Sequence, residues 1–198
     1  PAEKIHVKPN FLSAPIPLEE GEKKAALFIG RLSREKGIEH LLKAWERVDY
    51  PLWIAGDGPL RDWLVSAIDE RGLSHIRYLG RIGREQMSEL YARALFLVFP
   101  SIWYEGMSMV VLEALSAGVP LLCSDAVAMA SDLDTAGCAV LYPAGDSDAL
   151  GDRASALVSR PAACAVMGKE ARGLYRQNYT AEKNWKLLYT LYTSVLQS

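Results

Sequence analysis

Three basic residues, Arg31, Arg34 and Lys36, stand in a polar loop, Gly30-Arg31-Leu32-Ser33-Arg34-Glu35-Lys36-Gly37, directly after a short apolar stretch. If that stretch is a buried strand, Gly30 lets the chain turn away at the edge of a sheet, and Arg31 and Lys36 can both point over this edge. Fixed cations beside the free amides of a following helix are typical ligands of phosphate. The loop therefore predicts a phosphate site, although a solvated basic loop has the same composition.

Two glutamates, Glu105 and Glu113, stand eight positions apart after a second apolar stretch. Glu105 falls in a loop, and Glu113 falls within an apolar helix that we expect from about Ser108 to Gly118. A carboxylate in such a helix is costly unless it accepts hydrogen bonds, and a vicinal diol such as a ribose can donate two. The alternatives are a Glu113 that lies at the helix edge or bonds local amides, and a Glu105 that only interacts with the helix N-terminus.

Several turns follow other apolar stretches. The free amides of residues 106–109 form a further candidate site for an anion or a hydroxyl group. Gly80-Arg81-Ile82-Gly83 either lines a ligand or simply turns the chain before a helix. The segment 55–61 departs from a dinucleotide-binding motif because Arg61 replaces its last glycine, so a tight turn into a helix that starts near Pro59 is expected.

The composition excludes several classes of protein. Basic and acidic residues number 22 and 24 in 198, so the net charge of −2 disfavours a nucleic-acid binder. Half of the residues are hydrophobic and 23% are charged, which is typical of a globular domain, and no apolar run is long enough to span a bilayer. Scattered cysteines and histidines without metal-binding spacing predict reduced thiols, a cytoplasmic location and no metal site: Cys123, Cys138, Cys164, His6, His40 and His75.

Strand-like and helix-like stretches alternate along most of the chain. Short apolar runs predict buried strands at 26–29, 52–55, 76–79, 95–99, 120–123 and 139–141. Helical periodicity falls between them, at 38–48, 60–68, 84–93 and 108–118, and continues at 146–159, 162–177 and 180–197, where Thr180 can cap the last helix. This alternation predicts an α/β fold with a doubly wound parallel sheet, whose ligands bind at the carboxyl ends of the strands.

The two chemistry-bearing segments together resemble a known family. G-R-L-S-R-E-K-G at 30–37 and P-S-I-W-Y-E-G-M-S-M-V-V-L-E-A-L-S-A-G-V-P at 100–120 are similar to glycosyltransferase family 4, the group 1 glycosyltransferases. The resemblance covers roughly residues 5–198 and implies the Rossmann-like C-terminal half of the GT-B fold. It also implies transfer of a sugar from a UDP- or GDP-sugar, with retention of anomeric configuration and without a bound metal.

The resemblance implies roles for single residues. Arg31 and Lys36, next to Gly30, would bind the diphosphate and stabilise the leaving group, and Glu105 would hold hydroxyls of the donor sugar. These three side chains are the expected catalytic groups. The segment after Glu105 would meet sugar and phosphate through Gly106, Met107, Ser108, Met109 and Val110. Glu113 would hold the ribose, and the base would lie against Arg81 and Ile82.

The resemblance also implies an organisation for the whole protein. Residues 1–198 would be a donor-binding domain, with a lead-in at 1–24 that contains a strand at Ile5–Val7, and a C-terminal helix at 178–198. A saccharide or lipid-linked acceptor would bind an N-terminal domain that these 198 residues lack, so this fragment alone should be inactive. That domain could also associate with the inner face of a membrane. Two alternatives stay open: a nucleotide-sugar epimerase of GT-B fold and a non-catalytic nucleotide-binding module.

Overall fold

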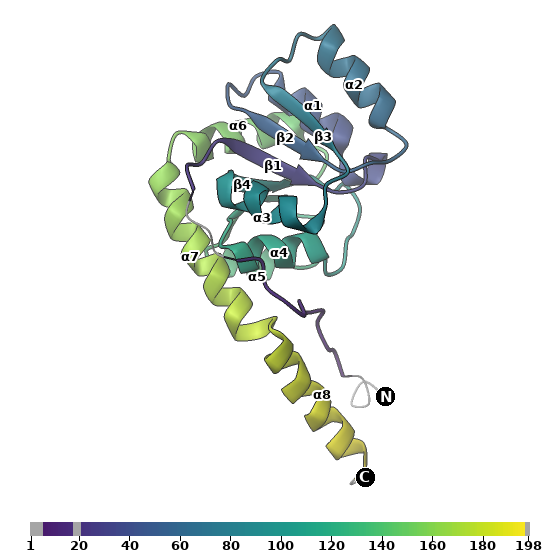
Figure 1. Ribbon diagram of the computed structural model, residues 1–198, viewed down its shortest axis with the longest axis vertical. Coiled ribbons are helices and arrows are strands. Elements are labelled where there is room, and N and C mark those ends of the chain that lie inside the picture. Colours follow the sequence, from purple (N-terminus) through teal and green to yellow (C-terminus); the bar gives the residue numbers. More distant parts are fainter. Residues whose placement is uncertain (1–5, 18–20, 197–198) are drawn as a thin grey trace.

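A computed structural model describes residues 6–17 and 21–196 and shows a six-stranded, all-parallel sheet (Figure 1). The strand order is β3-β2-β1-β4-β5-β6, which places the first strand in the middle of the sheet. The strands are β1 (Ala25–Ile29), β2 (Leu52–Ala55), β3 (Ile76–Gly80), β4 (Ala94–Phe99), β5 (Leu121–Ser124) and β6 (Ala139–Tyr142). Because the chain crosses over both faces from the central strands outward, the prediction of a doubly wound parallel sheet is confirmed.

Helices cover the sheet on both faces. They are α1 (Ile38–Trp45), α2 (Arg61–Glu70), α3 (Arg84–Arg93), α4 (Met109–Ala117), α5 (Ala130–Thr135), α6 (Ser147–Val158), α7 (Pro161–Asn178) and α8 (Ala181–Leu196), with a short 3-10 helix, η2 (Arg34–Lys36). Buried side chains of α1, α2 and α6 pack in one core and those of α3, α4 and α5 in the other, while α7 contributes Cys164 to the first and Ala171 and Tyr175 to the second. Every residue of β1, β4 and β5 is buried, which explains why all of them except Ser124, at the end of β5, are apolar.

The predicted strands and long helices agree with the structure to within a few residues at their ends. Gly118 ends α4 in the left-handed conformation, with φ 69°, and the hydroxyl of Thr180 accepts a hydrogen bond from the amide of Lys183 at 3.2 Å, as a cap of α8 should. The predicted turn before α2 is present, but the helix starts slightly later than the sequence pattern indicates. Pro59 lies in the turn before α2, because that helix begins only at Arg61.

Two segments differ from the expected secondary structure. The strand at Ile5–Val7 is wrong for its described part, because His6 and Val7 lie outside any strand; Ile5 lies outside the described residues. Helix α5 was not predicted. It has six residues and two buried apolar side chains, Ala130 and Leu133, and this is too little to produce a recognisable periodicity.

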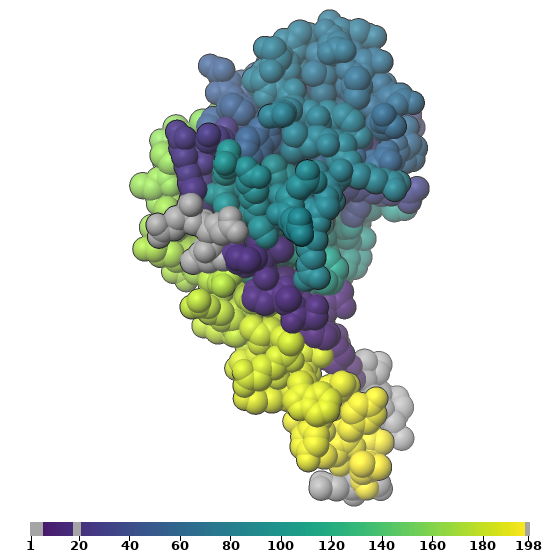
Figure 2. Space-filling view, viewed as in Figure 1, coloured from purple at the N-terminus to yellow at the C-terminus, as the bar shows by residue number. Residues whose placement is uncertain are grey.

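The final helix extends beyond the sheet and its covering helices (Figures 1 and 2). The chain before β1 runs beside the junction of α7 and α8: the amide of Leu12 bonds the carbonyl of Tyr179 at 3.3 Å, and the side-chain amide of Asn184 bonds the carbonyl of Pro9 at 3.3 Å. Further along α8, Trp185, Tyr189 and Tyr192 are 60–64% exposed. The beginning of the segment before β1 thus lies next to the start of α8, while its later residues Leu12 and Ile16 pack into the core.

No helix within residues 6–17 and 21–196 combines the length and the hydropathy needed to cross a membrane.

Candidate functional site

The loops that follow β1 and β4 are fastened to each other at the carboxyl edge of the sheet. The backbone carbonyl of Glu35 accepts two hydrogen bonds, one from the hydroxyl of Ser101 and one from the amide of Ile102, both at 3.0 Å. Ser101 is 2% exposed, so this contact is shielded from water. The predicted phosphate loop and the loop that contains Glu105 therefore form one connected unit.

Close backbone approach at Gly37 tightens this connection. Gly37 has a φ of 71°, and a Cβ atom at this position would lie 1.9 Å from the carbonyl oxygen of Pro100. Any other residue would meet both a strained backbone conformation and a clash with the neighbouring loop. The hydroxyl of Ser124, at the end of β5, bonds the carbonyl of Ser101 at 2.5 Å, so a third loop joins the unit.

Within this unit Lys36 and Glu105 form an ion pair. The ammonium group of Lys36 donates to Oε1 of Glu105, and each side chain is only 23% exposed. The same ammonium group lies 5.6 Å from the centroid of the Phe99 ring. Burial lowers the pKa of Lys36, and the charge of Glu35 opposes that shift. The structure thus brings together two of the three residues that the sequence marked as catalytic.

Glu105 is held by its backbone as well as by its carboxylate. Its amide bonds the carbonyl of Ala126 at 3.4 Å, and its carbonyl accepts from the amide of Ala128 at 2.8 Å. Its Oε2 atom is buried and has no hydrogen-bond partner among the described residues. The carboxylate therefore bonds Lys36 through one oxygen and does not bond the amides of α4, which is the alternative that the sequence left open.

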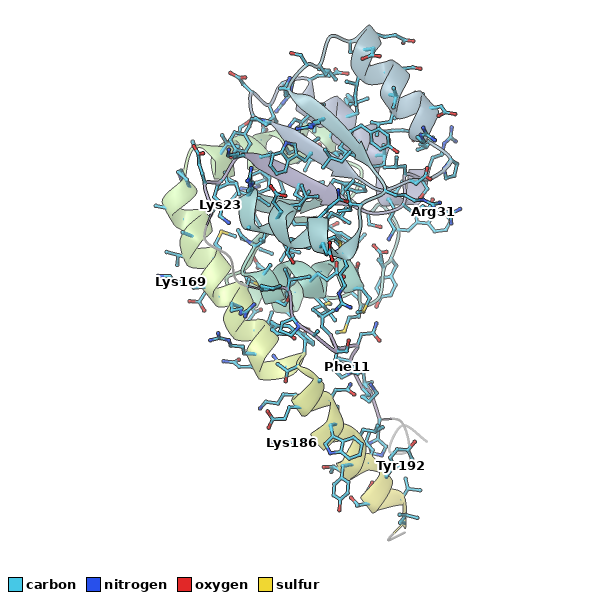
Figure 3. All side chains as sticks on the ribbon, in the orientation of Figure 1. Phe11, Lys23, Arg31, Lys169, Lys186 and Tyr192 are labelled. Atoms are coloured by element: carbon cyan, nitrogen blue, oxygen red, sulfur yellow. The ribbon has the colours of Figure 1, made fainter. Side chains whose placement is uncertain are left out.

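Arg31, the third predicted catalytic residue, makes no ion pair or hydrogen bond with Lys36 or Glu105 among the described residues. Its side chain is exposed, and Figure 3 shows it at the margin of the molecule, directed away from the sheet. The pKa of Glu35 is lowered mainly by a hydrogen bond from the hydroxyl of Ser33, at 2.5 Å. The positive charges of Arg31 and Lys36 lower it further, to a smaller extent. Gly30 marks the point where the loop leaves β1.

Glu113 lies one turn inside α4 and is bonded by a core residue. The phenol of Tyr91 donates to Oε2 of Glu113 at 3.2 Å and lies 3.4 Å from the carbonyl of Val110. Burial raises the pKa of Glu113, while the bond from Tyr91 and the charge of Arg84 act in the opposite direction. Sequence reasoning missed Tyr91, which reads as one more apolar position of α3.

A cavity of about 510 Å³ lies beside Glu113. Its wall is shared by α3, α4 and the segment before β1, and includes Phe11, Ile82, Arg84 and Met109. Apolar walls with a few polar groups are typical of pockets for small molecules. Two residues expected at the nucleoside, Ile82 and Glu113, thus border the same cavity.

Arg81 lies on the rim of the site and is paired with a residue that the sequence did not single out. Its Nε atom lies 3.0 Å from Oδ2 of Asp57, and its side chain is 83% exposed. The other carboxylate oxygen of Asp57 accepts from the amide of Gly58 at 2.8 Å. The signal that could have revealed Asp57 is its place directly after β2, because the carboxyl ends of parallel strands share one edge.

The start of α4 provides free amides. Ser108 precedes the helix in an extended conformation and makes no side-chain capping bond, so the first-turn amides of Met109 and Val110 have no acceptor within the helix. Gly106 is exposed, with nothing within 4 Å of a Cβ built on it. Met107 also contacts the segment before β1, because its carbonyl accepts a hydrogen bond from the side chain of Asn10 at 3.2 Å.

Known proteins resemble this chain over much of its length. It is 38% identical over 120 residues to the O-antigen chain mannosyltransferase B of Escherichia coli, which covers 57% of this chain and 31% of that protein. It is 31% identical over 170 residues to a glycogen synthase of Mycobacterium tuberculosis, covering 83% and 40%. The solved structure of Anabaena HepE in complex with UDP has a TM-score of 0.75 at 21% identity, over 86% of this chain and 49% of that one.

The chain thus spans less than half the length of these relatives. HepE, at its low identity, shows a shared fold alone. A family model described as "Glycosyl transferases group 1" matches residues 13–174, which include the phosphate loop, the Glu105 loop and α4. The match extends well past half of the 198 residues and agrees with the GT-B-like fold of the structural neighbours. The chain belongs to the group 1 glycosyltransferases.

Proposed function

We propose that this chain binds a nucleoside diphosphate sugar, with uridine or guanosine as the nucleoside, and is the donor-binding part of a retaining glycosyltransferase. The observation that supports this most directly is the ion pair of Lys36 and Glu105 at the carboxyl edge of the sheet. A cation for a diphosphate and a carboxylate for sugar hydroxyls lie there in direct contact. The nucleoside would occupy the cavity beside Glu113.

Each group has a definite task in this proposal. Lys36, Arg31 and the first-turn amides of α4 would stabilise the negative charge that collects on the diphosphate as the sugar leaves. Glu105 and Glu113 would accept hydrogen bonds from hydroxyls of the sugar and the ribose, since charged acceptors form the stronger bonds. The protein's own cations would take the part that a divalent metal plays at other diphosphate sites, so a metal is not required.

The acceptor would bind outside residues 1–198. Because the relatives are more than twice as long as the parts that match, we place the acceptor site in a further domain of a longer chain. The exposed aromatic side chains of α8, among them Trp185 and Tyr189, would contact that domain. By analogy with the polymer-building relatives, the acceptor would be a saccharide or a lipid-linked saccharide at the cytoplasmic face of a membrane.

Calorimetric titration of the 198-residue chain with UDP and with GDP tests the donor site. We expect one of them to bind, with the same affinity in the presence of a chelator. Lys36→Met and Arg31→Ala should each weaken binding about ten- to a hundredfold, the effect of losing a charge-assisted hydrogen bond. Arg34→Ala is the matched control, because Arg34 lies in the same loop but pairs outward with Glu39. Absence of binding, or binding that requires Mg²⁺ or Mn²⁺, would contradict the proposal.

A longer chain is needed to test the reaction. Joined to the part that its relatives possess, the protein should transfer the sugar and keep its anomeric configuration, which nuclear magnetic resonance of the product reports. Conversion of the donor into an epimer without an acceptor would instead identify an epimerase. Binding without any turnover would point to a non-catalytic module.

A further inference from the structure

The pair of Lys36 and Glu105 joins the cation expected at the diphosphate to the carboxylate expected at the sugar. We propose that Glu105 makes the site discriminate between a nucleoside diphosphate sugar and the free nucleoside diphosphate. The carboxylate of Glu105 pairs with Lys36 and competes there with a bound phosphate. When Glu105 loses its bond to Lys36, only the hydroxyls of a bound sugar can replace that bond. This inference rests on the proposed function, since it concerns the same site.

When Lys36 turns to a phosphate, the carboxylate of Glu105 remains without its partner. If Lys36 turns from Glu105 to a phosphate, Oε1 of Glu105 loses its bond, while Oε2 is already buried without a partner among the described residues. A buried or half-buried charge without a partner is more costly than the same charge in water. Free diphosphate therefore binds against the cost of isolating the Glu105 carboxylate.

Backbone hydrogen bonds on both sides of the pair keep the Glu105 carboxylate in the site. Hydrogen bonds at 3.4 Å and 2.8 Å hold the backbone of Glu105 to Ala126 and Ala128. On the other side, the amide of Lys36 bonds the carbonyl of Ser33 at 3.1 Å, and the carbonyl of Glu35 accepts two bonds from the Glu105 loop. Because both backbones are fixed, the carboxylate stays in the site when Lys36 turns to a phosphate.

The third step is the difference between the two ligands. A nucleotide sugar places hydroxyl groups next to the diphosphate, and these can donate to both oxygens of Glu105. The free nucleoside diphosphate has no such donors. A Glu105 that only held sugar hydroxyls would have no effect on the free nucleotide, whereas the ion pair predicts that Glu105 weakens its binding. After transfer, the leaving diphosphate would thus be released more readily than the donor.

Glu105→Gln separates these effects, because it removes the charge and keeps the shape. Titrations would use UDP, GDP, UDP-glucose, GDP-mannose, and the nucleosides uridine and guanosine. We expect the diphosphate to bind about two- to fivefold more tightly than to the unmodified chain, the range of a partly exposed ion pair. The matching nucleotide sugar should bind about tenfold more weakly, and the nucleoside should be unaffected.

Two controls make the result specific. Glu85→Gln removes a negative charge from an exposed position at the start of α3, close to the same sheet edge, and should leave all affinities unchanged. In the background of Lys36→Met, Glu105→Gln should no longer tighten diphosphate binding, because the effect acts through the lysine. Thermal unfolding of each variant verifies that the fold is retained.

The possible outcomes are distinct. If the unmodified chain binds neither UDP nor GDP, the proposed function fails and this inference fails with it. If the chain binds one of them but Glu105→Gln binds it equally well or more weakly, the discrimination is wrong and the donor site stands. Tighter binding of both diphosphate and nucleotide sugar would also overturn the inference, because Glu105 would then only repel phosphate.

Discussion

The phenol of Tyr91 reaches from the core to the carboxylate of Glu113 and donates a hydrogen bond to it at 3.2 Å. Tyr91 is fully buried, and burial raises its pKa well above the usual range, so it stays a donor at all physiological pH values. The carboxylate is thereby oriented beside the cavity in an otherwise apolar helix. Burial also raises the pKa of Glu113, which means that its charge is held in the fold at a cost in stability.

Glu113→Gln should therefore stabilise the chain at neutral pH. Because the pKa of Glu113 is higher in the folded than in the unfolded state, the unfolded state loses the proton first, and the free energy of unfolding falls as pH rises through this range. The variant should exceed the unmodified chain in stability at pH 7, and the difference should vanish below the ordinary carboxyl pKa of 4.5. Urea unfolding at both pH values measures this, and a variant less stable at pH 7 would refute it.

The same substitution should harm the proposed function. If Glu113 bonds the ribose, Glu113→Gln lowers the affinity for UDP or GDP about ten- to a hundredfold, because one or two charge-assisted hydrogen bonds become neutral ones. Uridine or guanosine alone should lose affinity by a similar factor, since the effect lies at the nucleoside. The exposed Glu70 in α2 provides the control substitution. A stabilised variant with unchanged nucleotide affinity would show that Glu113 has no part in binding.

Substitutions at two glycines would separate the energetic cost of a strained backbone from that of a clash between two loops. Gly37 and Gly72 have similar φ angles, 71° and 63°, but a Cβ at Gly37 would lie 1.9 Å from Pro100, whereas nothing lies within 4 Å of one at Gly72. Gly72→Ala should lower the free energy of unfolding by only about 1–2 kcal/mol, the cost of the left-handed conformation. Gly37→Ala should cost clearly more and also weaken diphosphate binding. Equal losses in chemical denaturation would contradict the close approach of the two loops.

The architecture could be predicted from the sequence because it depends on local patterns. The residues of β4 are uniformly apolar, since helices cover both faces, and Gly118 ends α4 where the pattern places it. Helix α5 was missed because its six residues are too short for a period to show. Patterns of this kind identify elements, and they contain no information about which side chains meet across loops.

The contacts of the site could not be predicted for that reason. Lys36 and Glu105 are 69 positions apart, and their pairing depends on how two loops after non-consecutive strands are tied together. Asp57 beside Arg81 and Tyr91 beneath Glu113 depend likewise on strand order and on the approach of α3 to α4. The residue types indicated the chemistry of the site, but its hydrogen bonds and ion pairs could be identified only from the three-dimensional structure.

The three cysteines should be unreactive in the folded chain. Cys123, Cys138 and Cys164 are all buried and free. Burial raises the pKa of Cys123 to about 12 and that of Cys138 to about 11, so almost no thiolate forms at pH 8. A disulfide reagent such as Ellman's reagent should modify none of them at pH 8 until denaturant is added, and then all three. Rapid reaction of the native chain would contradict the burial of these thiols.

The hydroxyl of Ser101 should affect diphosphate binding indirectly, by positioning the loop that contains Lys36. It bonds the carbonyl of Glu35 at 3.0 Å, but that carbonyl also accepts from the amide of Ile102, so Ser101→Ala leaves the Glu35 carbonyl with a partner. The free energy of unfolding should therefore fall by only about 0.5–1.5 kcal/mol, the value of one hydrogen bond. Because the bond aligns the loop of Lys36 with that of Glu105, diphosphate binding should weaken several-fold while nucleoside binding stays the same. Ser155→Ala, at an exposed position of α6, should change neither quantity. A loss of stability without any change in diphosphate affinity would show that Ser101 supports the fold alone and does not position Lys36.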